Sequence, residues 1–334
     1  WCLLQQDLLP DAQTRLAEYL ILYPDGRHAV MAQLQLGRIA AELGELERAE
    51  QQFAALATNR SDTARAQQAA YELGWVYARQ DRLDDAIAQF SRFISDAPSS
   101  ELSDDVAFYL GELFFNRRDY ERAQRAFLNV ASQYPSSPHA GAAAYWAAAA
   151  ALRRGAHDEC LAALSNYWPR IAGSTLALDA LLLRGDCLAA VGEHVAAYRA
   201  YHAAAQQTTG SYVAAEARLR MGECLLATTN ISAAISLYTE LAEGRHALTR
   251  ARALVGLGDA RHAAGDPRGA LSEWLRVLYD YRDFSAVAEQ ALARAARLYE
   301  ELNEPDRAQQ LYRLHGVTPA AAVTAVTSDS LPDK

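Results

Sequence analysis

The side chains of this sequence that could act together chemically are carboxylates that recur seven residues apart. Seven residues are nearly two turns of a helix, so the two members of such a pair share one face. Three pairs and one single carboxylate form these rows: Asp105, Glu112, Asp179, Asp186, Glu216, Glu223 and Asp259. Stacked like charges repel, so we interpret the rows as the lining of a negative groove that receives a basic segment of a protein partner. In the alternative interpretation, the earlier carboxylates favour helix N-termini through the helix dipole and the later ones are solvated surface.

A second group of residues combines aromatic and basic side chains. It consists of Arg38, Tyr71, Trp75 and Arg79. An exposed Trp beside Arg is typical of the few residues that dominate peptide binding. Aromatic residues at helical spacing also serve as ordinary packing, so the group has a binding and a structural interpretation.

Catalytic and metal-binding patterns are missing from the sequence. The eight histidines form no H-E-x-x-H motif or compact triad, and neither a Gly-rich phosphate loop nor G-x-S-x-G occurs. We therefore predict no enzyme activity and no cofactor. Cys187 and Cys224 occupy equivalent positions 37 residues apart, where stacked helices hold alpha carbons beyond the roughly 7 Å reach of a disulfide. We expect both to be small core residues.

The overall charge bears on the class of partner. The chain has 41 acidic and 32 basic residues, a net charge of −9, and its only lysine is Lys334. Without a basic excess there is little to attract a phosphate backbone or an anionic lipid surface, so we predict no nucleic-acid partner. No apolar stretch reaches the roughly 18 residues that a transmembrane helix needs, so we expect no membrane-spanning segment.

The elements that carry these residues follow from an internal repeat. A Gly or Ala recurs at intervals of 37, 37, 37, 37, 37, 36 and 38 residues, a regularity typical of a repeat architecture. These anchor positions are Gly37, Gly74, Gly111, Ala148, Gly185, Gly222, Gly258 and Ala296. A glycine inside a helix costs about 1 kcal/mol relative to alanine, so its recurrence predicts close contact between helices.

A second helix follows each anchor. Twelve residues after each anchor stands a small residue, and four residues further on a bulky one, as in Ala49 and Phe53. Positions i and i+4 share a helical face, so a neighbouring helix can approach at the first and pack against the second. Between the two helices lie residues suited to a tight turn, such as Gly44, Asp81 and Asn230. Each unit is thus a helical hairpin.

Proline and serine mark the connections between hairpins. Tyr134-Pro135-Ser136-Ser137 and Ala97-Pro98-Ser99-Ser100 follow second helices. Proline stops a helix, and serine can cap the next one.

Small residue, turn, small residue, aromatic and proline in this order resemble the tetratricopeptide repeat family over about residues 10 to 315. The resemblance implies an all-α, right-handed superhelical solenoid of antiparallel helix pairs. It also implies a concave groove lined by the first helices, where partners bind. The segments at residues 70–74, 107–111 and 134–137 look similar to a narrower group, bacterial envelope proteins of the Tol-Pal-associated and outer-membrane-assembly lipoprotein type. The middle departs from that group, since Ala148 replaces the anchor glycine.

We therefore expect three parts in the chain: the C-terminal part of a truncated repeat at residues 1–29, eight hairpins in one solenoid at 30–315, and a disordered tail at 316–334. The tail is rich in Thr, Ala, Ser and Pro without periodicity. The expected function is non-catalytic protein binding in a bacterial envelope assembly, in the periplasm. A cytoplasmic adaptor of the same fold, or a segment of a larger protein whose catalytic or pore domain lies outside this chain, are the alternatives.

Overall fold

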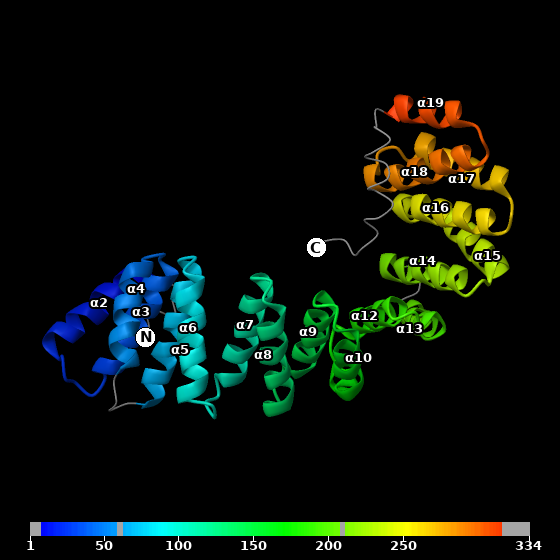
Figure 1. Cartoon of the computed structure of the whole chain (residues 1–334). Coiled ribbons are helices and arrows are strands. Elements are labelled where there is room, and N and C mark those ends of the chain that lie inside the picture. The colour runs from blue at the N-terminus through cyan, green and yellow to red at the C-terminus, as the bar shows by residue number, and fades with distance from the viewer. Residues whose placement is uncertain (1–7, 59–62, 208–210, 316–334) are drawn as a thin grey trace. The chain divides into compact units, whose positions relative to one another are not determined.

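The computed structural model describes residues 8–58, 63–207 and 211–315, and over these residues it is built from helices and the turns between them (Figure 1). Each anchor lies in the first helix of a hairpin. These first helices are α3 (Ala29–Glu42), α5 (Thr63–Arg79), α7 (Ser103–Asn116), α9 (Ala140–Arg153), α12 (Ala177–Ala190), α14 (Tyr212–Ala227), α16 (Ala247–Ala263) and α18 (Ser285–Glu301). The predicted all-α repeat fold is confirmed.

The second helices follow at the predicted places. They are α4 (Leu46–Ala57), α6 (Leu83–Asp96), α8 (Tyr120–Gln133), α10 (His157–Asn166), α13 (His194–Gln207), α15 (Ile231–Ala242), α17 (Pro267–Asp280) and α19 (Pro305–His315). Before the first hairpin, α2 (Leu9–Leu22) packs on α3 and buries Ala12, as a second helix would. One element was not predicted, the short helix α11 (Trp168–Ile171), which packs on α9.

In the hairpins whose anchor is glycine, a bulky side chain of the second helix packs directly on that glycine. A β-carbon added to Gly37 would lie 2.6 Å from Cε1 of Phe53, and one added to Gly111 would lie 2.6 Å from the same atom of Phe127. Both phenylalanines are fully buried. No real side chain tolerates such a separation, so only glycine lets the two helices approach this closely. The close contact predicted from the recurrence of glycine is confirmed.

The turn inside each hairpin has one residue in the left-handed region, always seven positions after the anchor. Four of these residues are glycines, with φ between +73° and +82°. The others are Asp81, Arg118, Thr229 and Asn303, with φ between +59° and +61°. Asn230 lies between α14 and α15 as expected, but it is the N-cap of α15, and its neighbour Thr229 takes the left-handed conformation.

Ser100 and Ser137 were expected to cap the helices that follow them, but they do not. Ser137 Oγ accepts a hydrogen bond from the backbone N–H of His139. In the same way, Ser100 Oγ accepts a hydrogen bond from the backbone N–H of Leu102. Both N–H groups belong to the residue just before the helix, and neither α7 nor α9 has a side-chain cap. The serines therefore hold a turn that sets the start of the helix, since proline forces the chain to reverse over only a few residues.

The helices group into two compact units, residues 1–176 and 177–334. In the N-terminal unit the first helices α3 and α5 contact each other directly, as do α14 with α16 and α16 with α18 in the C-terminal unit. Each unit is thus a stack of hairpins. One continuous solenoid over residues 30–315 stays a prediction, and the predicted tail at 316–334 lies outside the described residues.

The cysteines differ in redox state. Cys224 is a buried free thiol, as its expected core position requires. Cys160 and Cys187 are fully buried, and each is disulfide-bonded. Cys187 and Cys224 are therefore not joined to each other, in agreement with the repeat spacing, but the core role expected for Cys187 includes a disulfide that the sequence did not reveal.

Candidate partner-binding surface

One contact recurs between the first helices of neighbouring repeats. The residue one position after an anchor meets the residue two positions before the next anchor. This slot holds an ion pair in Arg38–Glu72, at 2.8 Å, and a ring contact in Trp75–Tyr109, with centroids 4.0 Å apart. We call the seven carboxylates of the predicted rows the acidic ladder. Its later members all occupy this slot: Glu112, Asp186, Glu223 and Asp259. An arginine opposite such a carboxylate can therefore compensate its charge.

In the C-terminal unit, Asp186 is compensated by arginine. Arg220 Nη1 lies 2.9 Å from Asp186 Oδ1, and the hydroxyl of Tyr201 donates to the same oxygen at 2.6 Å. Arg220 also pairs with Glu216 at 3.3 Å, and Glu216 accepts a hydrogen bond from Arg252. The side chains of Asp186 and Glu216 are only 16% and 18% exposed. Two of the predicted ladder carboxylates are therefore part of a charge-balanced network that joins α12, α14 and α16.

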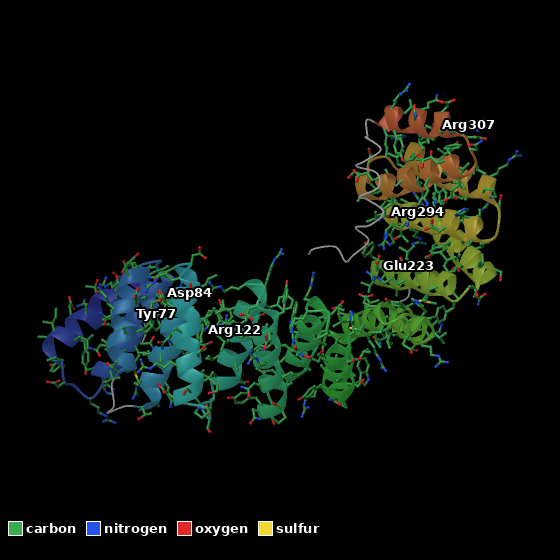
Figure 2. All side chains as sticks on the ribbon, in the orientation of Figure 1. Tyr77, Asp84, Arg122, Glu223, Arg294 and Arg307 are labelled. Carbon is green, nitrogen blue, oxygen red and sulfur yellow. The ribbon has the colours of Figure 1, made fainter. Side chains whose placement is uncertain are left out.

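The other ladder carboxylates of this unit are disposed in three ways. Arg294 donates to both oxygens of Asp259, at 2.9 and 3.1 Å. Glu223 is exposed on α14, and Figure 2 marks it together with Arg294. Asp179 is partly buried on α12, and desolvation raises the pKa of its carboxyl above the usual value. The C-terminal part of the ladder is thus not a row of bare negative charges.

In the N-terminal unit, Asp105 belongs to a different kind of contact. His139 Nε2 lies 2.7 Å from its Oδ1, and the hydroxyl of Tyr71 donates to its Oδ2 at 3.5 Å. Asp105 remains 45% exposed. The carboxylate is therefore oriented by neutral or titratable partners, and a large part of it faces solvent.

Glu112 is the exception among the slot carboxylates of this unit. The residue opposite it in the slot is Trp146 instead of an arginine. Among the residues that the structure describes, no hydrogen bond or ion pair satisfies its carboxylate. Burial raises the pKa of Glu112, and nearby His139 lowers it by less. Glu112 is thus a partly desolvated carboxylate that has no arginine partner among the described residues and only the weaker favourable charge of His139.

The predicted aromatic and basic group divides in the structure. Trp75 stacks on Tyr109 and meets Tyr71 edge to face, with centroids 6.1 Å apart. Arg38 turns to Glu72, and Arg79 is exposed at the end of α5. The aromatic members therefore lie with Asp105 and Glu112 of α7, whereas the arginines do not. We call this the aromatic–acidic surface; it consists of Tyr71, Trp75, Asp105, Tyr109 and Glu112.

The aromatic group and the acidic rows, expected as separate sites, thus meet on one surface, and Tyr109 belongs to it although it was not predicted. The signal was present in the repeat frame, because Tyr109 stands two positions before Gly111, directly opposite Trp75 in the slot. Two buried features mark the Trp75 side chain as packing as well as surface. Its ring contacts Phe90, and its indole Nε1 is buried without a hydrogen-bond partner among the described residues.

Two further properties of the described residues bear on the class of site. No group of three or more His, Cys, Asp or Glu side chains there is placed to hold a metal ion. Within the same ranges, no helix is both long enough and apolar enough to cross a bilayer.

Comparison with known families agrees with this geometry. The sequence profile described as tetratricopeptide repeat matches residues 3–63, 34–101 and 109–174. Residues 3–101 and 109–174 of this chain therefore carry tetratricopeptide repeats. The matched ranges include α2 to α6, α8 to α11 and the part of α7 from residue 109 on, and thus all of the aromatic–acidic surface except Asp105. The hairpins of the C-terminal unit have the same helix pair and the same left-handed turn position. None of the curated proteins matches the sequence significantly.

Solved structures share the tetratricopeptide fold at low sequence identity. The apo form of RapI is 11% identical with a TM-score of 0.56, over 99% of this chain and 97% of that one. The C-terminal part of a TPR repeat-containing protein from Cytophaga hutchinsonii is 13% identical with a TM-score of 0.57, over 77% of this chain and 99% of that one. Identities this low carry the fold alone.

Proposed function

We propose that this chain is a non-catalytic binding scaffold that holds a basic segment of a protein partner on the first helices of its N-terminal unit. Tetratricopeptide folds are typical of protein–protein interaction, and repeat stacks expose extended surfaces suited to it. The observation that carries the more specific proposal is Glu112, a desolvated carboxylate whose slot lacks the arginine that Asp186 and Asp259 have.

The chemistry of the aromatic–acidic surface suits a lysine or arginine side chain. A cation beside Glu112 and Asp105 would provide the charge that the slot lacks. The faces of Tyr71, Trp75 and Tyr109 attract cations through their ring quadrupoles, by about 0.5–2 kcal/mol. A hydrogen bond to a charged group adds about 1.5–3 kcal/mol. Together these terms favour a basic segment over a neutral or acidic one.

Glu112→Gln is expected to weaken binding of a basic peptide about tenfold without destabilising the fold. Loss of one charged hydrogen bond, worth about 1.4 kcal/mol or more, is a factor of ten in affinity. The fold is spared because burial holds the folded-state pKa of Glu112 above 4.5. The folded chain therefore binds more protons than the unfolded one, and ionised Glu112 lowers stability as pH rises. The measurement is fluorescence anisotropy of a short Lys–Ser repeat peptide, with denaturant unfolding alongside.

The matched control is Glu121→Gln, which removes the same charge from the exposed Glu121–Arg125 pair on the second helix α8. It should leave affinity unchanged. Wild-type binding should decline as pH falls toward the raised pKa of Glu112, from a higher pH than an ordinary glutamate would give. Equal affinities for Lys–Ser and Glu–Ser peptides, or equal effects of the two substitutions, would remove the basis of the proposal.

We also propose that the chain works in a bacterial envelope compartment, in the periplasm. The resemblance of residues 70–74, 107–111 and 134–137 to envelope tetratricopeptide proteins motivates this. The disulfide-bonded state of Cys160 and Cys187 supports it, because structural disulfides persist in oxidising compartments and are rare in the cytosol of most organisms.

Alkylation of the protein from its native cells separates this proposal from a cytoplasmic adaptor. The protein is denatured without reductant, treated with iodoacetamide and analysed by mass spectrometry. We expect Cys224 to be alkylated, because unfolding exposes its free thiol, and Cys160 and Cys187 to react only after reduction. Alkylation of all three without reductant would instead indicate a reducing compartment. A sample oxidised in air after purification serves as the positive control for disulfide detection.

A further inference from the structure

A pocket of about 310 Å³ opens between the first helices α3 and α5 of the N-terminal unit. This volume is at the small end of the range for ligand pockets, about 300–1,000 Å³. Its apolar lining comes from Leu34, which is buried, Met31, which is half-buried, and Ala64, which is exposed at the edge. The size and the apolar lining suit one apolar side chain of a bound segment.

The pocket has the same place in the repeat frame as the aromatic–acidic surface, one repeat earlier. Arg38 of the pocket and Trp75 of the surface both stand one position after an anchor. Gln68 of the pocket and Asp105 of the surface both stand six positions before one. The helices that carry the two sites are in contact, α3 with α5 through their backbones and α5 with α7 through the stacked rings of the aromatic–acidic surface. Packed helices lie about 8–10 Å apart, so we expect about this distance between the two sites.

The polar lining of the pocket favours an extended segment over a helical one. Gln35 of α3 and Gln68 of α5 line it, and no hydrogen bond among the residues that the structure describes engages either amide. A side-chain amide both donates and accepts, so it can bond the free N–H and C=O groups of an extended backbone. A helix uses most of these groups internally. Arg38 and Arg65 complete the lining, and each already interacts within the chain.

We propose that the segment bound at the aromatic–acidic surface crosses α5 in an extended, polyproline II-type conformation and places an apolar side chain in this pocket, three residues from its basic residue. This inference rests on the proposed function. A polyproline II helix has three residues per turn and rises about 3.1 Å per residue, so side chains three positions apart share one side at about 9 Å. That distance matches the expected separation of the two sites. An α-helix needs about seven residues for the same span.

The test uses the full chain and fluorescent peptides that each carry one lysine and one leucine in a background of serine and alanine. The leucine stands two, three or seven residues from the lysine, before it in one series and after it in the other. In one series we expect the spacing of three to bind about fivefold more tightly than the other two, because burial of part of a leucine side chain contributes that much. Equal affinities at all spacings, or an optimum at seven, would overturn the inference.

Ala64→Phe tests the pocket itself, with Ala55→Phe as its matched control. Both alanines are exposed, but Ala55 lies on the second helix α4 and is not part of the pocket. Ala64→Phe should weaken the peptide of spacing three about fivefold, because the ring occupies the leucine site, and Ala55→Phe should not.

A peptide in which serine replaces the leucine should bind the wild type and the Ala64→Phe variant equally. An equal loss for the peptides with and without leucine, or no effect of Ala64→Phe on either, would contradict the pocket assignment. If Glu112→Gln still weakens the Lys–Ser peptide in that case, only the pocket assignment fails and the proposed function stands.

Discussion

Gly74→Ala is expected to destabilise the chain by about 1–2 kcal/mol, although alanine is the better helix former. A β-carbon at Gly74 would lie 2.6 Å from Cζ and 2.7 Å from Cδ1 of Phe90, and closer still to Cε1. The ring is fully buried and cannot retreat, because Trp75 and Tyr109 contact it at 5.9 and 5.4 Å between centroids. Overpacking of this kind costs about 1–3 kcal/mol, which exceeds the helix-propensity gain of about 1 kcal/mol.

A compensating substitution at Phe90 follows from the fourth repeat. There the anchor is Ala148 and the bulky partner is Leu164, both buried. Gly74→Ala with Phe90→Leu reproduces that pair, so the double variant should be less destabilised than the sum of the two single variants. We expect a coupling of about 1 kcal/mol or more, within the range for residues in contact. The measurement is the free energy of unfolding in urea for the four members of the cycle.

Gly173→Ala is the control for Gly74→Ala. The nearest atom to its added β-carbon is the carbonyl oxygen of Arg170 at 3.7 Å, an ordinary contact. Alanine there should be neutral or stabilising, because it restricts only the unfolded chain. Equal effects at Gly74 and Gly173, or strict additivity in the cycle, would contradict the packing argument. The requirement for glycine opposite an aromatic ring does not hold in the last repeat. There the anchor is Ala296 and the bulky partner is Tyr312 of α19, which stays 8% exposed.

The hairpins could be predicted from the sequence because each depends on residues of fixed spacing. Glycine at the anchor and a bulky residue sixteen positions later, such as Gly37 and Phe53, meet within one hairpin. The helix period alone places them on facing sides. The turn position seven after the anchor was equally regular, but Thr229 was missed. A β-branched residue is unfavourable in the left-handed region, so residue type pointed to the neighbouring Asn230.

The candidate site was harder to predict because its contacts join different repeats. The carboxylates of Asp186 and Asp259 are visible in the sequence, but their partners Arg220 and Arg294 are 34 and 35 residues further on. The positions one residue after the anchors show a row of carboxylates. The compensating arginines stand two residues before the next anchors and are not part of that row. Only the contact between neighbouring first helices shows that these two positions face each other. The same geometry shows that Glu112 faces Trp146, which supplies no charge, where Asp186 and Asp259 face arginines.

Arg220→Gln is expected to destabilise the C-terminal unit by about 3 kcal/mol at neutral pH. Removing one partner of a buried ion pair costs about 3–5 kcal/mol, because the other charge stays buried without compensation. Arg220 itself is 24% exposed, which places the expected value at the lower end. Its loss leaves both Asp186 and Glu216 without their shared cation, although Arg252 still contacts Glu216. The measurement is denaturant unfolding together with amide exchange in α12 and α14.

The pH dependence separates this effect from lost packing. Desolvation already raises the pKa of Asp186, and Arg220 lowers it. In the variant the folded-state pKa therefore rises further above the unfolded value, so the folded chain binds more protons in that window. Its stability then increases relative to wild type as pH falls from neutral toward the unfolded-state value near 4. A deficit that stays constant over this range would mean that the Arg220 side chain stabilises through its aliphatic part.

Asp186→Asn in the Arg220→Gln background completes the test. Because the uncharged pair leaves no bare carboxylate at this position, the double variant should recover about 1–2 kcal/mol of the loss, within the range for coupled neighbours. Binding of the basic peptide should be unchanged in both variants, since the Asp186 network is already charge-balanced in the wild type and Glu112 is not part of it. Asp186 would then contribute to stability and Glu112 to binding, although both belong to the same acidic ladder in the sequence. That division is what the arginine opposite Asp186 and the tryptophan opposite Glu112 together predict.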